Sequence, residues 1–259
     1  TIVFRRGNGH THQYYNLSSN QSVTGGTIQI GDASTPVSQT IRINSTTPVY
    51  NLTVNATNAP TAQLLTNDLT VKNDVTISGG TLNANSLNLN VGGHWTNNGT
   101  FTPGAGTVTF NGLANQNLTG STATTFNILT MNNAAGLTLS GSVNTTVNGT
   151  LNLTSGVIST GANRVIIPAS GSVTRTAGHI FGKLQKNVAT GSNVTCNFEI
   201  GDAASANYTP ASLTFASVSA AGDLIAQAVS GDHPQIGSAT LNASKSVNRY
   251  WSLTNSGTS

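Results

Sequence analysis

The chain has 259 residues, of which only 7% are Asp, Glu, Lys or Arg, compared with about 25% in an average globular protein. Ten basic and seven acidic residues give a formal charge of +3. No basic cluster exceeds the pair Arg5-Arg6, so the sequence lacks the charged surface of a nucleic-acid-binding protein. Low charge is common in extracellular β proteins, and the regular spacing of the apolar residues excludes a disordered chain.

The chain opens with a short apolar run, Thr1, Ile2, Val3 and Phe4, which has the composition of a β-strand. Strand patterns broken by turns continue to residue 43, so we assign residues 1–43 to an N-terminal strand segment and cap. Natural proteins normally blunt exposed strand edges, and this chain has few charges with which to do so. The first strand therefore has two candidate roles: it caps the repeat that follows it, or it adds to an open sheet of another copy.

His10 and His12 place two imidazoles on the same side of an extended segment, as a metal site would require. No third ligand of suitable type lies near in the sequence. We therefore interpret the pair as part of a polar surface strand and expect no metal and no cofactor.

Similar tetrapeptides of alternating polar and apolar residues recur in the next part of the chain. They begin at Asn51, Asp68, Ser86, Thr107, Ile128 and Thr150, so the interval between successive starts is nearly constant. A near-constant period of this size is typical of a solenoid in which one repeat makes one coil. The sequence therefore predicts a parallel β-helix of about 17–22 residues per coil over residues 44–170. A long sandwich of antiparallel hairpins also produces alternation, but it gives no reason for the fixed spacing.

The stretch from Val75 to Asn163 contains no charged residue, and its alternation predicts which side chains point into the solenoid. The inward residues predicted in the repeats are Leu69, Val71, Leu87, Leu89, Val108, Phe110, Leu129, Met131, Leu151 and Leu153. Asn side chains at equivalent turns are expected to hydrogen-bond from coil to coil.

Charged residues return after Pro168, and the predicted strands lengthen, for example over residues 193–200, 211–218 and 247–254. Gly-Asp turns separate several of these strands. Longer strands separated by such turns are typical of antiparallel sheets rather than of a short-stranded solenoid. We therefore assign residues 171–259 to a β-sandwich-like module packed on the end of the solenoid.

Candidate catalytic residues are few. β-Helix enzymes that cleave polysaccharides use carboxylates as acid, base or calcium ligand. The predicted solenoid has only Asp68 and Asp74, close to Lys72, and such a group is usually a solvated corner. Cys196 is the single cysteine, so it forms no intrachain disulfide, and its strand-like surroundings favour a packing role. We expect the protein not to be an enzyme.

A surface-binding alternative rests on outward-facing threonines. Thr70, Thr109 and Thr130 occupy the same place in three repeats, and a flat ladder of hydroxyl groups could match a regular lattice such as ice. Asn88 and Asn152 take the equivalent places in two other repeats and break the ladder.

Trp95 follows Gly92, Gly93 and His94 at a predicted turn. Its ring either stacks on a sugar ring or covers the next coil. Surface glycans are therefore candidate partners.

Two repeats and several later runs resemble a known group of proteins. Residues 99–112 and 147–158 resemble a repeat that is common in large secreted surface proteins of Bacteroidota, and residues 198–202, 208–210 and 246–251 resemble the module that follows those repeats. The resemblance covers about residues 85–255 and implies export across the outer membrane, often by type IX secretion, and a role as adhesin, filament or surface-layer component. No C-terminal sorting domain is present, and similar modules continue beyond the tryptophan-containing strand. The chain is therefore either trimmed or completed by another chain.

These observations lead to one functional expectation. No apolar run is long enough to span a bilayer, and the start at Thr1 is either the boundary of an excised segment or the mature end left by a signal peptide, which the composition favours. We expect a secreted, non-catalytic structural protein of the cell surface, a subunit of a fibre or an adhesin, that joins copies of itself head to tail through open β edges. The alternative is a monomeric β-solenoid that binds ice or a carbohydrate surface.

Overall fold

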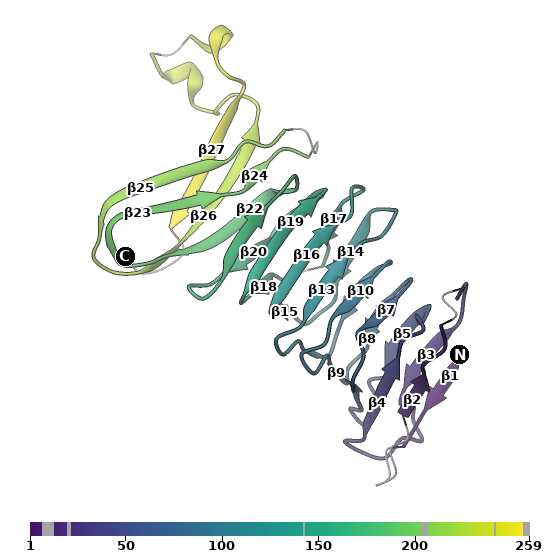
Figure 1. The fold of residues 1–259 in the computed structure, drawn as a ribbon. Coiled ribbons are helices and arrows are strands. Elements are labelled where there is room, and N and C mark those ends of the chain that lie inside the picture. Colours follow the sequence, from purple (N-terminus) through teal and green to yellow (C-terminus); the bar gives the residue numbers. More distant parts are fainter. Residues whose placement is uncertain (7–12, 20–21, 142, 204–206, 241, 256–259) are drawn as a thin grey trace.

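Strands account for 55% of the computed structural model and helices for 2%, which confirms the all-β prediction. The structure describes residues 1–6, 13–19, 22–141, 143–203, 207–240 and 242–255. Figure 1 shows an elongated stack of short-stranded coils that starts at the N-terminus and leads into a part with longer strands. The parallel β-solenoid has about eight turns.

The strands of each full coil lie on three parallel faces, which we call faces A, B and C. Face A contains β1 (Ile2–Phe4), β3 (Thr27–Ile30), β5 (Asn51–Val54), β8 (Val75–Ile77), β11 (Trp95–Asn97), β14 (Gln116–Thr119) and β17 (Leu137–Leu139). Face B contains β2 (Gln13–Asn16), β4 (Thr40–Ser45), β6 (Thr61–Leu64), β9 (Thr81–Asn83) and β12 (Thr100–Thr102), and is continued by β15 (Thr124–Phe126) and β18 (Thr145–Val147). Face C contains β7 (Leu69–Val71), β10 (Leu89–Val91), β13 (Thr107–Phe110), β16 (Ile128–Asn132), β19 (Thr150–Ser155) and β21 (Ser172–Arg175). The longer β20 (Val157–Ile167) and β22 (His179–Val188) continue both face A and face B, and β24 (Ile200–Gly201) pairs with β22.

The coils stack in register, so similar residues form continuous columns inside the solenoid. On face C, Leu89 pairs with Leu69 and Val108, and Leu129 pairs with Val108 and Leu151. Nine of the ten predicted inward residues are buried, which confirms the alternation on this face. The tenth, Leu87, lies in the turn before β10 and is half-buried; it packs against the core but does not belong to the column.

The predicted coil length needs correction at its lower limit. Asn51 begins β5 on face A, whereas Asp68 directly precedes β7 on face C of the same coil, so the interval between these two starts does not measure a coil. The partner of Leu69 in the next coil is Leu89, which gives a coil of about 20 residues, a usual period for a solenoid repeat. The first coils on face A are longer still, since Ile28 pairs with Leu52.

Parallel stacking extends beyond both predicted boundaries of the solenoid. β1 pairs with β3 and β2 pairs with β4, so the strands of residues 1–43 are the first coils of the same stack. Beyond residue 170, β21, β22 and β24 continue the parallel pairing. The solenoid is therefore longer than the predicted span of residues 44–170.

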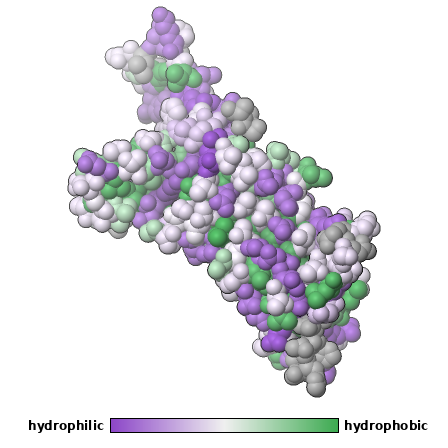
Figure 2. Space-filling model, viewed as in Figure 1, coloured by the Kyte–Doolittle hydropathy of each residue, from purple (hydrophilic) through white to green (hydrophobic). Residues whose placement is uncertain are grey.

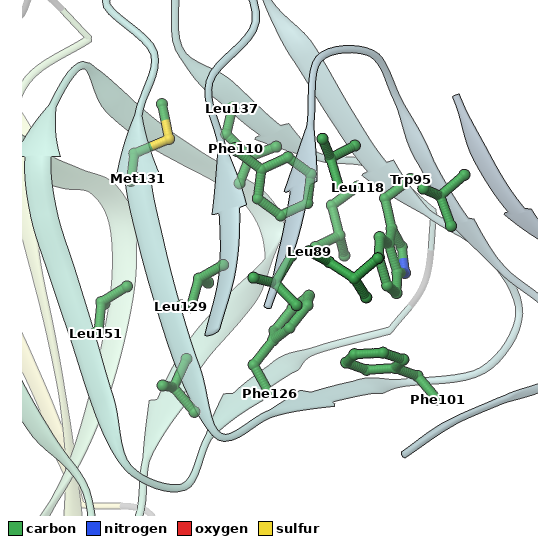
Figure 3. Close-up of a cluster of buried hydrophobic side chains, with 14 of the residues drawn as sticks. Leu89, Trp95, Phe101, Phe110, Leu118, Phe126, Leu129, Met131, Leu137 and Leu151 are labelled. Carbon is green, nitrogen blue, oxygen red and sulfur yellow. The ribbon is translucent and has the colours of Figure 1, made fainter. Parts of the chain in front are cut away.

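An aromatic cluster fills the middle of the solenoid (Figure 3). The ring of Trp95 lies 4.9 Å from that of Phe101, 5.7 Å from that of Phe126 and 6.4 Å from that of Phe110, between ring centroids. All three contacts are edge-to-face, which aromatic pairs prefer over a face-to-face sandwich. Because these residues come from faces A, B and C, the cluster ties the three faces together.

The pairing changes from parallel to antiparallel at β22. β26 (Gly222–Ser230) pairs antiparallel with β22, and β27 (Arg249–Asn255) pairs antiparallel with β26. A second sheet consists of β23 (Gly191–Phe198) and β25 (Ala211–Val218), which are also antiparallel. The predicted later antiparallel sheet is thus present, and it grows from the last coils of the solenoid.

Candidate functional site

The carboxylates that were considered for catalysis hold adjacent coils together. Asp68 accepts hydrogen bonds from the main-chain N–H and the side-chain amide of Asn88, at 2.8 and 2.9 Å. Asp74 accepts the main-chain N–H of His94 at 2.8 Å. The two carboxylates lie on opposite sides of β7, before face C and before face A.

Metal-ligating groups are scattered in the described parts of the chain. No three His, Cys, Asp or Glu side chains there lie close enough together to hold one metal ion. His10 and His12 lie outside the described residues.

Trp95 does not present its ring to a ligand, so its prediction as a surface-binding residue is wrong. The glycine-rich turn ends at His94, and Trp95 is the first residue of β11. Its side chain points inward and is completely buried against the other aromatic rings (Figure 3). Its indole N–H has no hydrogen-bond partner within the described residues. The ring contributes to packing.

The predicted threonine ladder on face C exists, with one change of residue. Thr70, Thr109 and Thr130 share one outward column, in which Asn90 stands between Thr70 and Thr109. In the coil between those of Thr70 and Thr109, the ladder position is therefore occupied by Asn90 and not by Asn88. Asn152 occupies the same position in the coil after Thr130. The Asn152 side chain donates to the Thr130 hydroxyl at 3.0 Å. In the C-terminal part of this ladder, the side chains of neighbouring coils are thus hydrogen-bonded to each other.

Two longer threonine columns lie on the other faces and were not predicted. On face A the column consists of Thr53, Thr76, Thr96 and Thr119, and on face B it consists of Thr40, Thr61, Thr81 and Thr100. Each column runs through four successive coils without interruption. These threonine side chains are half-buried or exposed, and no hydrogen bond of their hydroxyl groups is found among the described residues. In the sequence, the apolar-threonine pairs beginning at residues 52, 75, 95 and 118 mark the face A column.

Beside the threonines of face A runs a column of hydrogen-bonding side chains. Asn51 accepts the main-chain N–H of Asp74 at 3.1 Å, and Asp74 accepts that of His94. The Nδ1 atom of His94 in turn accepts the main-chain N–H of Asn117 at 3.0 Å. Since Nδ1 is the acceptor, the ring carries its hydrogen on Nε2. Coil-to-coil bonding was expected from Asn alone, and Asp and His take part as well.

The outermost strands of the longest sheet are β1 and β27. This 14-stranded sheet runs from β1 through face A to β22, β26 and β27. In the described residues β1 pairs only with β3, and β27 only with β26, so each has one unpaired edge. The predicted assembly residues Thr1, Ile2, Val3 and Phe4 therefore form the first edge of their own solenoid.

Apolar side chains are exposed beside both edges. Ile2 is 58% exposed at the first edge, and Trp251 and Leu253 are 43% and 45% exposed on β27. Trp251 pairs with Ala228 and Leu253 with Ala226, whose side chains are buried. Since directly paired residues point to the same side of a sheet, Trp251 and Leu253 lie on the side that faces the core. The second sheet ends at β25 and leaves them partly uncovered.

The antiparallel module also contains the chain's perturbed cysteine and tyrosine. Burial raises the pKa of the Cys196 thiol, and the neighbouring Lys186 opposes this shift. Burial also raises the pKa of Tyr208, whose ring is stacked by the Arg175 guanidinium 3.5 Å from its centroid. Cys196 belongs to the hydrophobic core, and the Tyr208 ring also lies beside that of His179, so both side chains take part in packing.

No family model matches the sequence, and neither a curated protein nor a solved structure shows significant similarity to it. Across the described segments, no helix combines the length and the apolar character that crossing a membrane requires.

Proposed function

We propose that the protein is a non-catalytic structural subunit of the cell surface, secreted and joined end to end with further copies into a fibre. The observation that carries the proposal is the position of the two unpaired edges, β1 and β27, at opposite ends of one sheet. Pairing the β27 edge of one copy with the β1 edge of the next extends that sheet through both molecules. A contact of this kind uses two different surfaces, so it continues into a filament unless it closes into a ring.

The exposed side chains support this arrangement. An unpaired strand edge with little charge is a template for pairing with another chain. The ion pair of Arg5 with Asp32 neutralises one of the few charges close to β1. Joining two copies would also cover Ile2, Trp251 and Leu253, which are otherwise exposed to water.

Proline substitution can test the proposed contact between β27 and β1 of the next copy, because the structure shows which main-chain groups of the two edge strands point outward. The Phe4 carbonyl bonds to Gly31 on the β3 side, so the main-chain groups of Val3 point to the unpaired edge. By the same alternation, the Asn248 carbonyl faces β26 and the groups of Leu253 point away from it. Val3→Pro and Leu253→Pro each remove one outward N–H and leave the bonds to the neighbouring strand in place.

We expect the intact chain to form filaments in electron micrographs and both variants to stay monomeric with an unchanged circular dichroism spectrum. Deleting residues 1–6 tests whether the first strand is needed. Ile43→Pro, in the buried part of β4, is the control for a proline that disrupts the fold itself. A monodisperse monomer from the intact chain, or normal filaments from both edge variants, would refute the proposal.

The uninterrupted threonine columns favour a second candidate, a monomer that binds the surface of ice. The threonines of face A repeat at the strand spacing, roughly 4.8 Å, and β-branched side chains have few rotamers, so their methyl and hydroxyl groups form a regular array. No aromatic ring stands in this column, which favours a lattice of water over stacked sugar rings. The intact protein should then show thermal hysteresis that Thr76→Lys abolishes and Thr109→Lys retains. Absence of hysteresis in the intact protein removes this candidate.

A further inference from the structure

The segment between β26 and β27 forms a protrusion at the end of the molecule far from the N-terminus (Figure 1). It contains two short 3-10 helices, η1 (Ile236–Ser238) and η2 (Ala243–Lys245). Its base is closed by the main-chain bond from Gly231 to Asn248, 2.9 Å long, and by the hydroxyl of Ser246, which donates to Asp232. The protrusion is therefore a bounded unit on the antiparallel module.

A hollow of about 710 Å³ lies inside this protrusion and against the first residues of β27. Its volume falls in the range of small-molecule binding sites, roughly 300–1,000 Å³. Tyr250 lines it from β27, and its ring meets that of His233 edge-to-face at 4.8 Å between centroids. Together with Ile236, Ala239 and Val247, the two rings give the hollow a largely apolar wall. Figure 2 shows hydrophilic residues together with a few hydrophobic ones on the visible side of the protrusion.

The polar groups of the hollow combine acceptors with donors. One oxygen of Asp232 accepts from Ser246, and the other has no partner in the described part of the chain. The side-chain oxygen of Asn242 accepts from Ser244, so its amide N–H groups remain available as donors. Gln235 adds a second amide, which likewise makes no side-chain bond within the described residues.

The charges that line the hollow nearly cancel. The Arg249 guanidinium pairs with Asp202, and the other charged groups of the lining are one ammonium group, that of Lys245, and one carboxylate, that of Asp232. A ligand without net charge therefore fits this site better than an anion. A carboxylate and amides beside an aromatic ring match a sugar, because vicinal hydroxyl groups both donate and accept while the C–H face packs on the ring.

We propose that this hollow binds one unit of a neutral saccharide. The site is built within a single chain, so it goes beyond the proposed filament and does not depend on it. Such a site would provide adhesion to a glycan.

The test uses the full chain carrying Val3→Pro, which stays monomeric whether or not the intact chain forms filaments, and nuclear magnetic resonance titration with methyl glycosides of glucose, galactose, mannose, N-acetylglucosamine and glucuronic acid. We expect one or more neutral glycosides to shift amide signals of residues 231–250 in a saturable manner, with millimolar affinity. Asp232→Asn keeps an acceptor for Ser246 but removes the charged acceptor, so the affinity should fall about tenfold. Asp68→Asn, on the solenoid, is the matched control and should leave the affinity unchanged.

Three results would overturn the proposal. The first is no saturable shift with any neutral glycoside. The second is binding of glucuronic acid alone that disappears with added salt, because this indicates a general anion site. Binding that Asp232→Asn leaves unchanged would place the saccharide elsewhere and would also refute it. All of these readings come from the monomer, so they are independent of whether filaments form.

Discussion

Replacement of Leu129 by Ala should destabilise the solenoid strongly. Leu129 is 1% exposed and stands between Val108 and Leu151 in the inner column of face C. The substitution removes the apolar contacts of the side chain and leaves a cavity between two neighbouring coils. Both neighbouring strands are fixed by main-chain bonds to β16, so the coils cannot close the gap. We expect a loss of about 2–5 kcal/mol in the free energy of unfolding.

The matched control is Leu113→Ala, because the Leu113 side chain is 100% exposed in the turn after β13. It should change the free energy of unfolding by less than about 0.5 kcal/mol, since it removes no buried contact. Urea unfolding followed by far-ultraviolet circular dichroism measures both variants. A loss below about 1 kcal/mol for Leu129→Ala would falsify the assignment of Leu129 to a tightly packed column.

Three further predictions address the turns, the cysteine and the N-terminal ion pair. Gly120→Ala should destabilise the protein by about 1–3 kcal/mol, because Gly120 has a φ of +134° and an added Cβ would lie 1.9 Å from the Asn97 carbonyl oxygen. In the control Gly25→Ala the added Cβ meets no atom within 4 Å, so urea unfolding should show no change in stability. Cys196 should react slowly with a thiol reagent at pH 8 and quickly in denaturant, because burial raises its pKa and lowers the thiolate fraction; equal rates would contradict this. Hydrogen bonding to Arg5 lowers the pKa of Asp32, so this ion pair stabilises the fold at neutral pH. The stabilisation is lost as the pH falls through the lowered pKa of Asp32. Arg5→Gln should raise the pKa of Asp32, as measured by a titration of its carboxyl resonance.

The alternation of polar and apolar residues was enough to predict the inward side chains of face C, because its inner positions are almost all aliphatic or aromatic. Leu69, Val108, Leu129 and Leu151 lie at similar places in short strands, so the period was visible without any structural information. The shift at Leu87 arose because the turn before β10 contains two residues of positive φ, Asn85 and Ser86, at 52° and 66°. Because the shift is of two residues, Leu89 in place of Leu87, it keeps the alternation and is not resolved by hydrophobicity alone.

Faces A and B were harder to predict because polar residues point into the solenoid there. Asn97 and Thr124 are buried, and the Asn97 amide donates to the Thr124 hydroxyl at 3.1 Å. Gln116 is buried and donates to the main-chain oxygens of Val91 and Gly93. Such residues interrupt the apolar pattern, and only the neighbouring coil shows how their hydrogen bonds are satisfied. The face A threonine column was missed because the intervals between its members are unequal, so the sequence does not show which threonines belong together.

The error at Trp95 came from the residues before it. Gly92, Gly93 and His94 indicate a turn, and an aromatic residue next to a turn is often exposed. A turn of this solenoid can be followed directly by an inward residue, and the place where the strand begins depends on the coil below. The protruding hollow was missed because its lining residues, such as Asp232 and Tyr250, form no recognisable motif.

The side-chain bonds between coils also have a direction that bears on assembly. Asn51, Asp74 and His94 each accept a main-chain N–H from the following coil, and on other faces Asn88 and Asn98 do the same. Each described coil joined in this way thus offers acceptors toward the C-terminal end and donors toward the N-terminal end. Two N-terminal ends facing each other would oppose donor to donor, which favours the β27 edge over a second β1 edge as the partner of β1. The polarity of the coils therefore favours a filament of one direction over a symmetric dimer, and polarity in electron micrographs of the filaments would test this reasoning.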